Sequence, residues 1–329
     1  MNKSITLNKS SLSHKSNGAV KTFLKNISPF NNRTDMPAAL FVIKKLLAFA
    51  LCYWVGLFIA EGLVIGVLLA CGKNFLHGEM FSDDIMTLIS LFGMIVPIAV
   101  CVIYWKLAEK RKLPEMGVTK SFSGWFTGAG IGALLLIISV SAIMVTGAIK
   151  LDGFSTDFNA AMFLLMLGGY AVQGATEEFL CRGVVFSALK DKVSLPAALG
   201  ASALVFILPH MSTLMDAEPM FIILGVINLT AISCLFSFVM LRTGNIWAAC
   251  GLHSLWNFIL ESVCGLTVSG SEGAKSSIIN MHAEGENLLN GGIYGIEASL
   301  VTFVVIAAAS GIIYYSIKKK GRNAENGVQ

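Results

Sequence analysis

Two adjacent carboxylates lie within a segment that is apolar enough to cross a membrane. Glu177 and Glu178 are followed by Arg182, and the surrounding sequence reads AMFLLMLGGYAVQGATEEFLCRGVVF. Ionisable groups are costly in hydrocarbon, so they usually mark a reaction or transport site. Because two neighbouring carboxylates repel each other, one of them can hold a proton at neutral pH and take part in proton transfer.

Two more polar groupings follow in later apolar segments. His210 comes four residues after Phe206, and Asn257 comes four residues after His253. A spacing of four places both members of a pair on one face of a helix. Phe206 by itself is interpreted as a packing residue rather than a chemical group.

The polar residues of the three segments are expected at similar depths in the membrane. At a helical rise of about 1.5 Å per residue, Glu177 lies about 20 Å and Arg182 about 12 Å from the cytoplasmic end of their segment. On the same measure His210 lies about 24 Å, His253 about 12 Å and Asn257 about 18 Å from the corresponding end. Since the hydrocarbon core is about 30 Å thick, three helices would bring their polar groups into one central layer. The sequence therefore predicts a single intramembrane site.

The composition indicates an all-α, polytopic integral membrane protein. The chain has 329 residues, of which 55% are hydrophobic and 13% are charged, whereas soluble domains carry about 25% charged residues. Its net charge of +4 resides in loops and tails and does not indicate nucleic-acid binding. The seven cysteines lie in or beside apolar segments, without CxxC spacing, and are interpreted as packing residues.

About eight segments have the length of a transmembrane helix. They lie near 46–71, 85–105, 125–149, 160–188, 195–214, 220–241, 245–264 and 297–316. We expect three parts: a basic, disordered cytoplasmic tail over 1–35, an eight-helix domain over 36–320 with its motif core at 160–264, and a short cytoplasmic tail over 321–329. The polar run 265–296 is expected to be a loop.

The distribution of basic residues predicts the orientation. All but three of the 24 Lys and Arg residues lie on the side of the N-terminal tail, and the exceptions are Lys73, Lys150 and Lys275. We therefore expect both termini in the cytoplasm and a location in the plasma membrane. The short loops favour a prokaryotic source. Two isolated carboxylates, Glu61 and Glu261, are expected to have structural or interfacial roles.

The three polar groupings resemble the motifs of the CPBP family of intramembrane proteases, also called Abi or CAAX amino-terminal proteases, which includes the type II CAAX prenyl endopeptidases. The family pattern is EExxxR, then FxxxH, then HxxxN or HxxxD. Here it reads Glu177-Glu178-Phe-Leu-Cys-Arg182, Phe206-Ile-Leu-Pro-His210 and His253-Ser-Leu-Trp-Asn257. The resemblance covers roughly residues 120–264, and it implies a membrane-embedded endopeptidase acting on a membrane-associated peptide or protein that need not be prenylated.

The resemblance also implies a role for each residue. Glu177 and His210 would bind and activate the attacking water, and Glu178 would pair with Arg182. His253 and Asn257 would donate hydrogen bonds to the oxyanion. Pro209 removes a backbone hydrogen bond and would bend the helix beside His210.

Metal dependence and two other functions are left open by the sequence. If zinc is bound, its expected ligands are Glu178, His210 and His253; otherwise the chemistry needs no cofactor. No HExxH motif is present. One alternative is a catalytically silent bacteriocin-immunity or scaffold protein with the same fold, and a less favoured one is a proton-coupled transporter. Complete motifs argue against the first, and the absence of internal repeats argues against the second.

Overall fold

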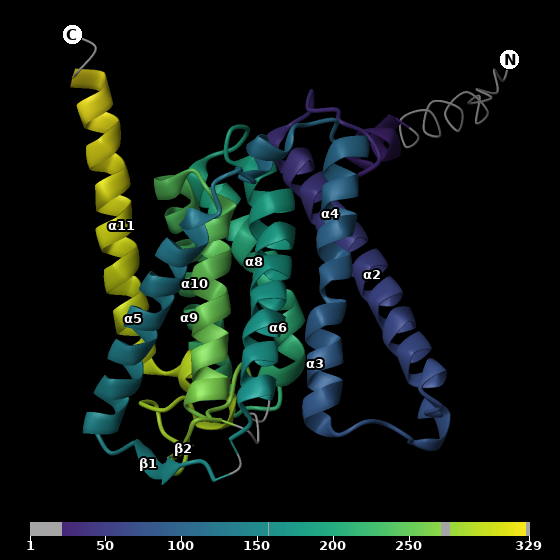
Figure 1. The fold of residues 1–329 in the computed structure, drawn as a ribbon. Coiled ribbons are helices and arrows are strands. Elements are labelled where there is room, and N and C mark those ends of the chain that lie inside the picture. Colours follow the sequence, from purple (N-terminus) through teal and green to yellow (C-terminus); the bar gives the residue numbers. More distant parts are fainter. Residues whose placement is uncertain (1–21, 157, 271–276, 327–329) are drawn as a thin grey trace, which may run out of the picture.

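The protein is a bundle of long helices with one small sheet, and the computed structural model describes residues 22–156, 158–270 and 277–326 (Figure 1). The α-helices are α2 (Ala38–Ala70), α3 (Asp83–Gly93), α4 (Ile95–Leu107), α5 (Ser123–Val145), α6 (Ala160–Glu178), α7 (Ser187–Leu189), α8 (Leu195–Leu214), α9 (Pro219–Thr243), α10 (Ile246–Phe258) and α11 (Leu300–Asn326). Two π-helical segments are η3 (Phe179–Phe186) and η4 (Ile259–Val263). Four 3₁₀ helices are η1 (Phe75–His77), η2 (Leu113–Met116), η5 (Gly292–Tyr294) and η6 (Ile296–Ala298).

The all-α membrane fold predicted from the sequence is confirmed, but the count of eight spans is not. Six stretches of the described chain are long and apolar enough to cross a membrane. They are Ala38–Ala70, Asp83–Leu107, Ser123–Val145, Leu195–Leu214, Pro219–Thr243 and Leu300–Asn323. The helices α6 and α10 do not meet those criteria. Both end in a π-helical segment, and α10 has only 13 residues before its own.

The strands β1 (Ile149–Phe154) and β2 (Ile279–Ala283) pair antiparallel, from Ile149 opposite Ala283 to Phe154 opposite Ile279. Neither strand was predicted. The third span was expected to continue to residue 149, but α5 ends at Val145 and Gly147 turns the chain with φ +78°. The run 265–296 was expected to be a loop, yet it contains β2. The pairing joins segments about 130 residues apart, so no local sequence pattern predicts it.

Buried lysines explain why the first helix starts earlier than expected. Lys44 and Lys45 were placed before the first span, but α2 begins at Ala38 and both side chains are buried. Lys45 Nζ lies 2.5 Å from Glu109 Oε1, and Tyr104 donates to the same oxygen at 2.6 Å. Lys44 Nζ donates to Asn31 Oδ1 at 2.9 Å. Partners inside the protein thus let these charges remain within a helix.

The predicted tails are covered only in part by the structure. The disordered tail expected over 1–35 falls mostly on residues 1–21, which lie outside the described residues. Residues 22–27 are helical, and the segment after them contacts α2 through Lys44. At the other end α11 continues to Asn326, so the expected C-terminal tail starts inside this helix, and 327–329 lie outside the described residues.

Small residues allow α10 to pack closely between α5 and α6. A Cβ at Gly128 of α5 would overlap the carbonyl oxygen of Ala248, and one at Gly132 would lie 2.5 Å from the carbonyl oxygen of Leu252. On α6, a Cβ at Gly174 would lie 2.6 Å from Ser254 Oγ. Such contacts bring helix backbones together in membranes, where no hydrophobic force drives helices to associate. They fix the position of α10, which carries His253.

Replacing Gly128 by Ala should therefore destabilise the bundle. We expect Gly128→Ala to lower the free energy of unfolding by about 1–3 kcal/mol, the usual cost of overpacking, because the neighbour is rigid backbone. The measurement is the unfolding midpoint in detergent micelles. The matched control is Gly130→Ala on the same helix, where the position is exposed and a Cβ meets nothing within 4 Å. Equal midpoints for the two variants would contradict the proposed packing.

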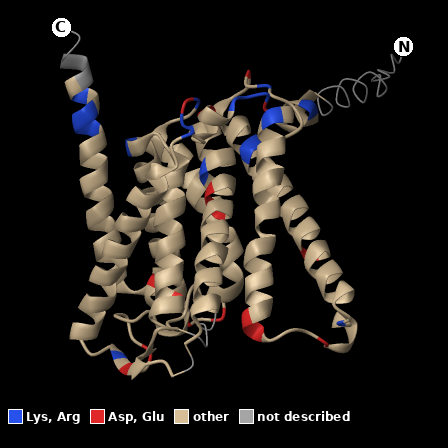
Figure 2. Ribbon diagram, viewed as in Figure 1, with Lys and Arg blue, Asp and Glu red and all other residues tan. Residues whose placement is uncertain are grey.

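Charged residues are distributed unevenly between the ends of the bundle. Figure 2 shows Lys and Arg gathered mainly at the end where α2 begins and α11 ends. Lys73, after α2, and Lys150, in β1, lie at the opposite end, with acidic residues such as Asp83 and Glu284. Lys275 is outside the described residues. This asymmetry is the structural counterpart of the orientation predicted from the sequence.

Both termini are expected in the cytoplasm. A reporter that is active only in the cytoplasm should give signal when fused after Gln329, and none when inserted after Gly270. Signal from the Gly270 insertion alone would reverse the orientation. Each fusion is first tested for insertion in the membrane, so that a misfolded fusion is not counted.

Candidate active site

The acidic pair lies at the point where α6 changes from α- to π-helical geometry. Glu177 and Glu178 are the last residues of α6, and the π-helix η3 begins at Phe179. Short π-helical segments are frequent at functional sites. Next to the pair, Thr176 Oγ1 donates to the carbonyl oxygen of Met94 at 2.5 Å. This contact ties the end of α6 to the junction of α3 and α4.

Arg182 is completely buried and is held on several sides. Its Nε lies 3.1 Å from Glu178 Oε2, and Nη2 donates to the Ser233 carbonyl oxygen at 3.2 Å and to Ser233 Oγ at 3.1 Å. The guanidinium carbon lies 4.8 Å from the ring centres of both Phe206 and Phe236. A buried cation needs such partners, and aromatic faces stabilise it further.

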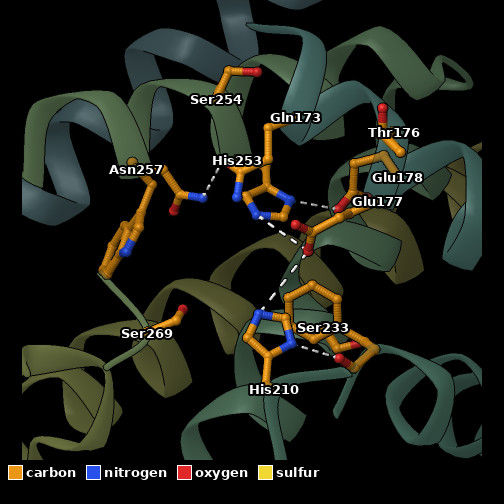
Figure 3. A network of polar contacts seen from close by, with 12 residues as sticks. Gln173, Thr176, Glu177, Glu178, His210, Ser233, His253, Ser254, Asn257 and Ser269 are labelled. Atoms are coloured by element: carbon orange, nitrogen blue, oxygen red, sulfur yellow. Dashed lines mark hydrogen bonds and ion pairs between the residues drawn. The ribbon is translucent and has the colours of Figure 1, made fainter. Parts of the chain in front are cut away.

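His253 connects this ion pair to the other carboxylate. Its Nδ1 lies 3.0 Å from Glu178 Oε1, and its Nε2 lies 3.8 Å from Glu177 Oε2. The ring stacks on Phe236 with centres 4.8 Å apart and an angle of 17°. Because Glu178 accepts a hydrogen bond from Nδ1, the opposite ring nitrogen is directed toward Glu177, as Figure 3 shows. Glu178 thus fixes the orientation of the imidazole.

His210 approaches Glu177 from the side of α8. Its Nε2 lies 4.0 Å from Glu177 Oε2, while Nδ1 is 2.8 Å from the Phe206 carbonyl oxygen (Figure 3). A carbonyl can only accept, so Nδ1 donates this hydrogen bond, and Nε2 is directed toward Glu177. At 4.0 Å the two atoms do not bond directly, but one water can hydrogen-bond to both.

Glu177 and His210 line a cavity of about 180 Å³. Its walls come from α2, α6, η3, α8 and the segment after η4, and they consist of Phe49, Tyr53, Glu177, Leu180, Cys181, Val205, Phe206, Pro209, His210, Ser212, Thr213 and Ser269. The Glu177 side chain is 18% exposed and that of Glu178 is 0% exposed. The adjacent carboxylates therefore have separate surroundings: one faces the cavity, and the other is enclosed with Arg182.

Asn257 lies beside this cluster rather than in the cavity wall. Its Nδ2 donates to Gln173 Oε1 at 3.1 Å, and Gln173 is one turn before Glu177 on α6. The six residues predicted from the sequence are thus brought together. Glu177, Glu178, Arg182, His210 and His253 form one connected cluster of ion pairs and close contacts. Asn257 is linked to this cluster only through its hydrogen bond to Gln173, on the helix that carries Glu177.

Sequence reasoning missed two helices beside the site. They are α9, which holds Arg182, and α2, whose Phe49 and Tyr53 line the cavity. Ser233 and Phe236 on α9 hold Arg182, and no polar motif marks that helix. Gln173 on α6 was missed as well, and it accepts a hydrogen bond from the predicted site residue Asn257. A signal for Gln173 was its spacing of four from Glu177, on the same helix face.

The isolated carboxylates lie apart from the cluster. Glu61 is exposed on α2 and lines a groove between α2 and α3. Glu261 is buried in the π-helix η4. Neither has a hydrogen bond or ion pair with a member of the cluster among the described residues.

The predicted zinc ligands do not converge. Glu178 Oε1 contacts His253 Nδ1 and its Oε2 contacts Arg182, whereas His210 Nε2 lies on the other side of the imidazole, toward Glu177. Zinc binding requires three donors about 2.0–2.3 Å from one point. Within the described ranges, no set of three His, Cys, Asp or Glu side chains has the geometry of a metal site. The residues present therefore do not fit the expected metal centre.

Comparison with known families agrees with the motifs. Residues 159–259 match the family of type II CAAX prenyl endopeptidases described as Rce1-like. The matched segment contains all six predicted site residues and confirms the family resemblance that was predicted from the three motifs. It supports a CAAX-type intramembrane protease at the level of the family. No curated protein and no solved structure matches the chain.

The buried ion pair between Glu178 and Arg182 should contribute to the stability of the folded protein. Glu178→Gln leaves Arg182 buried without a counter-charge, so we expect a loss of about 3–5 kcal/mol in the free energy of unfolding, the usual cost of breaking such a pair. The measurement is the unfolding midpoint in detergent. Glu177→Gln on the same helix turn is the matched control, and it should change the midpoint little because that side chain faces the cavity. A Glu178→Gln protein as stable as the control would contradict this division of roles.

Proposed function

We propose that the protein is an intramembrane endopeptidase that hydrolyses a peptide bond in a membrane-associated peptide or protein. One observation carries the proposal. A single carboxylate oxygen, Glu177 Oε2, has the Nε2 atoms of His210 and His253 at 4.0 Å and 3.8 Å, beside a small cavity inside a bundle of apolar helices. This arrangement can hold one water and remove its proton.

In the proposed reaction, a water bound between Glu177 and His210 attacks the substrate carbonyl carbon. Glu177 accepts one proton from the water as the new C–O bond forms, and the carbonyl electron pair moves to oxygen. When the C–N bond breaks, Glu177 returns that proton to the departing amine. His210 is suited to hold the water because its Nδ1 proton is bound to the Phe206 carbonyl oxygen.

His253 is the donor nearest to the reacting carboxylate. With Nδ1 bound to Glu178, a doubly protonated His253 can also donate from Nε2, and the Glu178 carboxylate stabilises that charge. Asn257, the other predicted oxyanion donor, already donates to Gln173. Its amide nitrogen carries a second hydrogen, which can serve an oxyanion while the bond to Gln173 is kept.

We further propose that the reaction needs no metal, because Glu178 is occupied by Arg182 and His253. The site would lie in a multi-pass protein of a prokaryotic plasma membrane. Apart from Glu177 and His210, the described residues that line the cavity include no charged or imidazole side chain, which suits an apolar peptide segment that enters from the lipid.

Glu177→Ala and His210→Ala should each abolish proteolysis while the protein stays folded. The test compares membrane proteomes of cells with wild-type protein or either variant, and it seeks a fragment that only the wild type produces. Glu61→Gln is the matched control, because it changes another carboxylate in an apolar helix that lies outside the cluster. The purified wild type should keep its activity after treatment with a strong chelator.

The alternatives give different results. Identical fragments from the wild type and Glu177→Ala would reject the protease and favour a silent immunity or scaffold protein. Loss of activity on chelation, restored by Zn²⁺, would reject the metal-free mechanism. Proton uptake coupled to solute movement in vesicles, without any cleavage, would favour the transporter.

A further inference from the structure

The oxyanion of the proposed reaction can use donors beyond those predicted from the motifs. Oxyanion holes act through hydrogen-bond donors directed at the atom where charge develops. His253 can supply one such donor, and Asn257 Nδ2, which donates one hydrogen to Gln173 Oε1 at 3.1 Å, carries a second hydrogen. The helices that line the cavity use their backbone N–H groups within the helix, and the N–H of Ser269 donates to Glu297 Oε2 at 2.6 Å. A further donor would therefore come from a side chain in the cavity wall.

Four hydroxyl side chains line the cavity. Three of them already donate their hydrogen: Ser212 to the Pro209 carbonyl oxygen at 3.0 Å, Thr213 to the His210 carbonyl oxygen at 3.2 Å and Ser269 to Glu297 Oε2 at 2.8 Å. The fourth is Tyr53, whose hydroxyl has no hydrogen bond to any of the residues that the structure describes. Its donor is therefore not taken by another of those residues.

Packing holds the ring of Tyr53 in place. It stacks on Phe49 with ring centres 5.6 Å apart and an angle of 16°, and it meets Trp54 edge to face at 5.2 Å. Tyr53 lies on α2, in the wall of the cavity that Glu177 and His210 also line.

We propose that Tyr53 is a catalytic residue, whose hydroxyl donates a hydrogen bond to the substrate carbonyl oxygen as it becomes an oxyanion. The proposal rests on the proposed function. The phenol keeps its proton throughout: the water proton goes to Glu177 and later to the amine, while Tyr53 only stabilises the negative charge between these steps. The role belongs to α2, which lies outside the segment matched by the protease family.

The test is Tyr53→Phe, which removes the hydroxyl and keeps the ring. We expect kcat to fall about 10²- to 10³-fold, as when one oxyanion donor is lost, with KM changed little. The probe is the membrane protein whose cleavage depends on Glu177, reconstituted with the enzyme in phosphatidylethanolamine–phosphatidylglycerol vesicles. Tyr315→Phe on α11, where the side chain is 61% exposed, is the matched control and should keep full activity.

A second measurement separates chemistry from packing. Replacing Tyr53 by fluorinated tyrosines makes the phenol a stronger donor with little change of shape, so kcat should follow the acidity of the phenol. A purely structural role predicts no such trend.

The outcomes distinguish the two proposals. A Tyr53→Phe enzyme with kcat within about threefold of wild type, beside an inactive Glu177→Gln enzyme, would overturn the role of Tyr53 alone, since an oxyanion donor is worth far more than that. A raised KM with unchanged kcat would also overturn it. Equal activity of Glu177→Gln and wild type would instead overturn the proposed function.

Discussion

The structure around the site depends on one buried cation. Arg182 has no exposure to solvent, so its charge must be balanced within the protein. Glu178 supplies the counter-charge, Ser233 accepts two hydrogen bonds, and two phenylalanine rings cover the faces of the guanidinium. Arg182 lies in η3 and its partners come from α6, α8 and α9, so the cation determines how four segments meet. An unpaired buried cation costs several kcal/mol of folding free energy, roughly 3–5, so the four segments are stable only when they pack together.

The need to pair Arg182 gives the two adjacent glutamates different surroundings. Because Glu178 is committed to Arg182 and His253, it orients an imidazole but is not available to substrate. Glu177, one residue earlier, points to the other side and meets the cavity with His210. Both residues belong to the last turn of α6, where successive side chains point about 100° apart around the helix axis. Neighbouring residues of the same type thus acquire different environments.

The motif residues were predictable, but their supporting partners were not. On three segments, a spacing of four residues predicted that two side chains share a helix face. The pairs are Glu178 with Arg182, Phe206 with His210 and His253 with Asn257. Phe206 was expected to pack, and its ring does so against the guanidinium itself. The rings and hydroxyls beside the candidate site, Phe236, Ser233 and Tyr53, lie in largely apolar stretches of α9 and α2. In such helices no periodicity distinguishes a face toward lipid from a face toward a site.

The sequence by itself determined the class of the fold and which residues form the candidate site, because apolar length and the cost of buried charge are local properties of the chain. Tertiary structure decided which groups face each other. It separated Glu177 from Glu178, turned Asn257 toward Gln173, kept the expected zinc ligands apart, paired β1 with β2 and placed Tyr53 in the cavity. These outcomes depend on the close approach of α5, α6 and α10 at their glycines and on the balance of charge around Arg182. Both involve residues far apart in the chain, which local patterns do not encode.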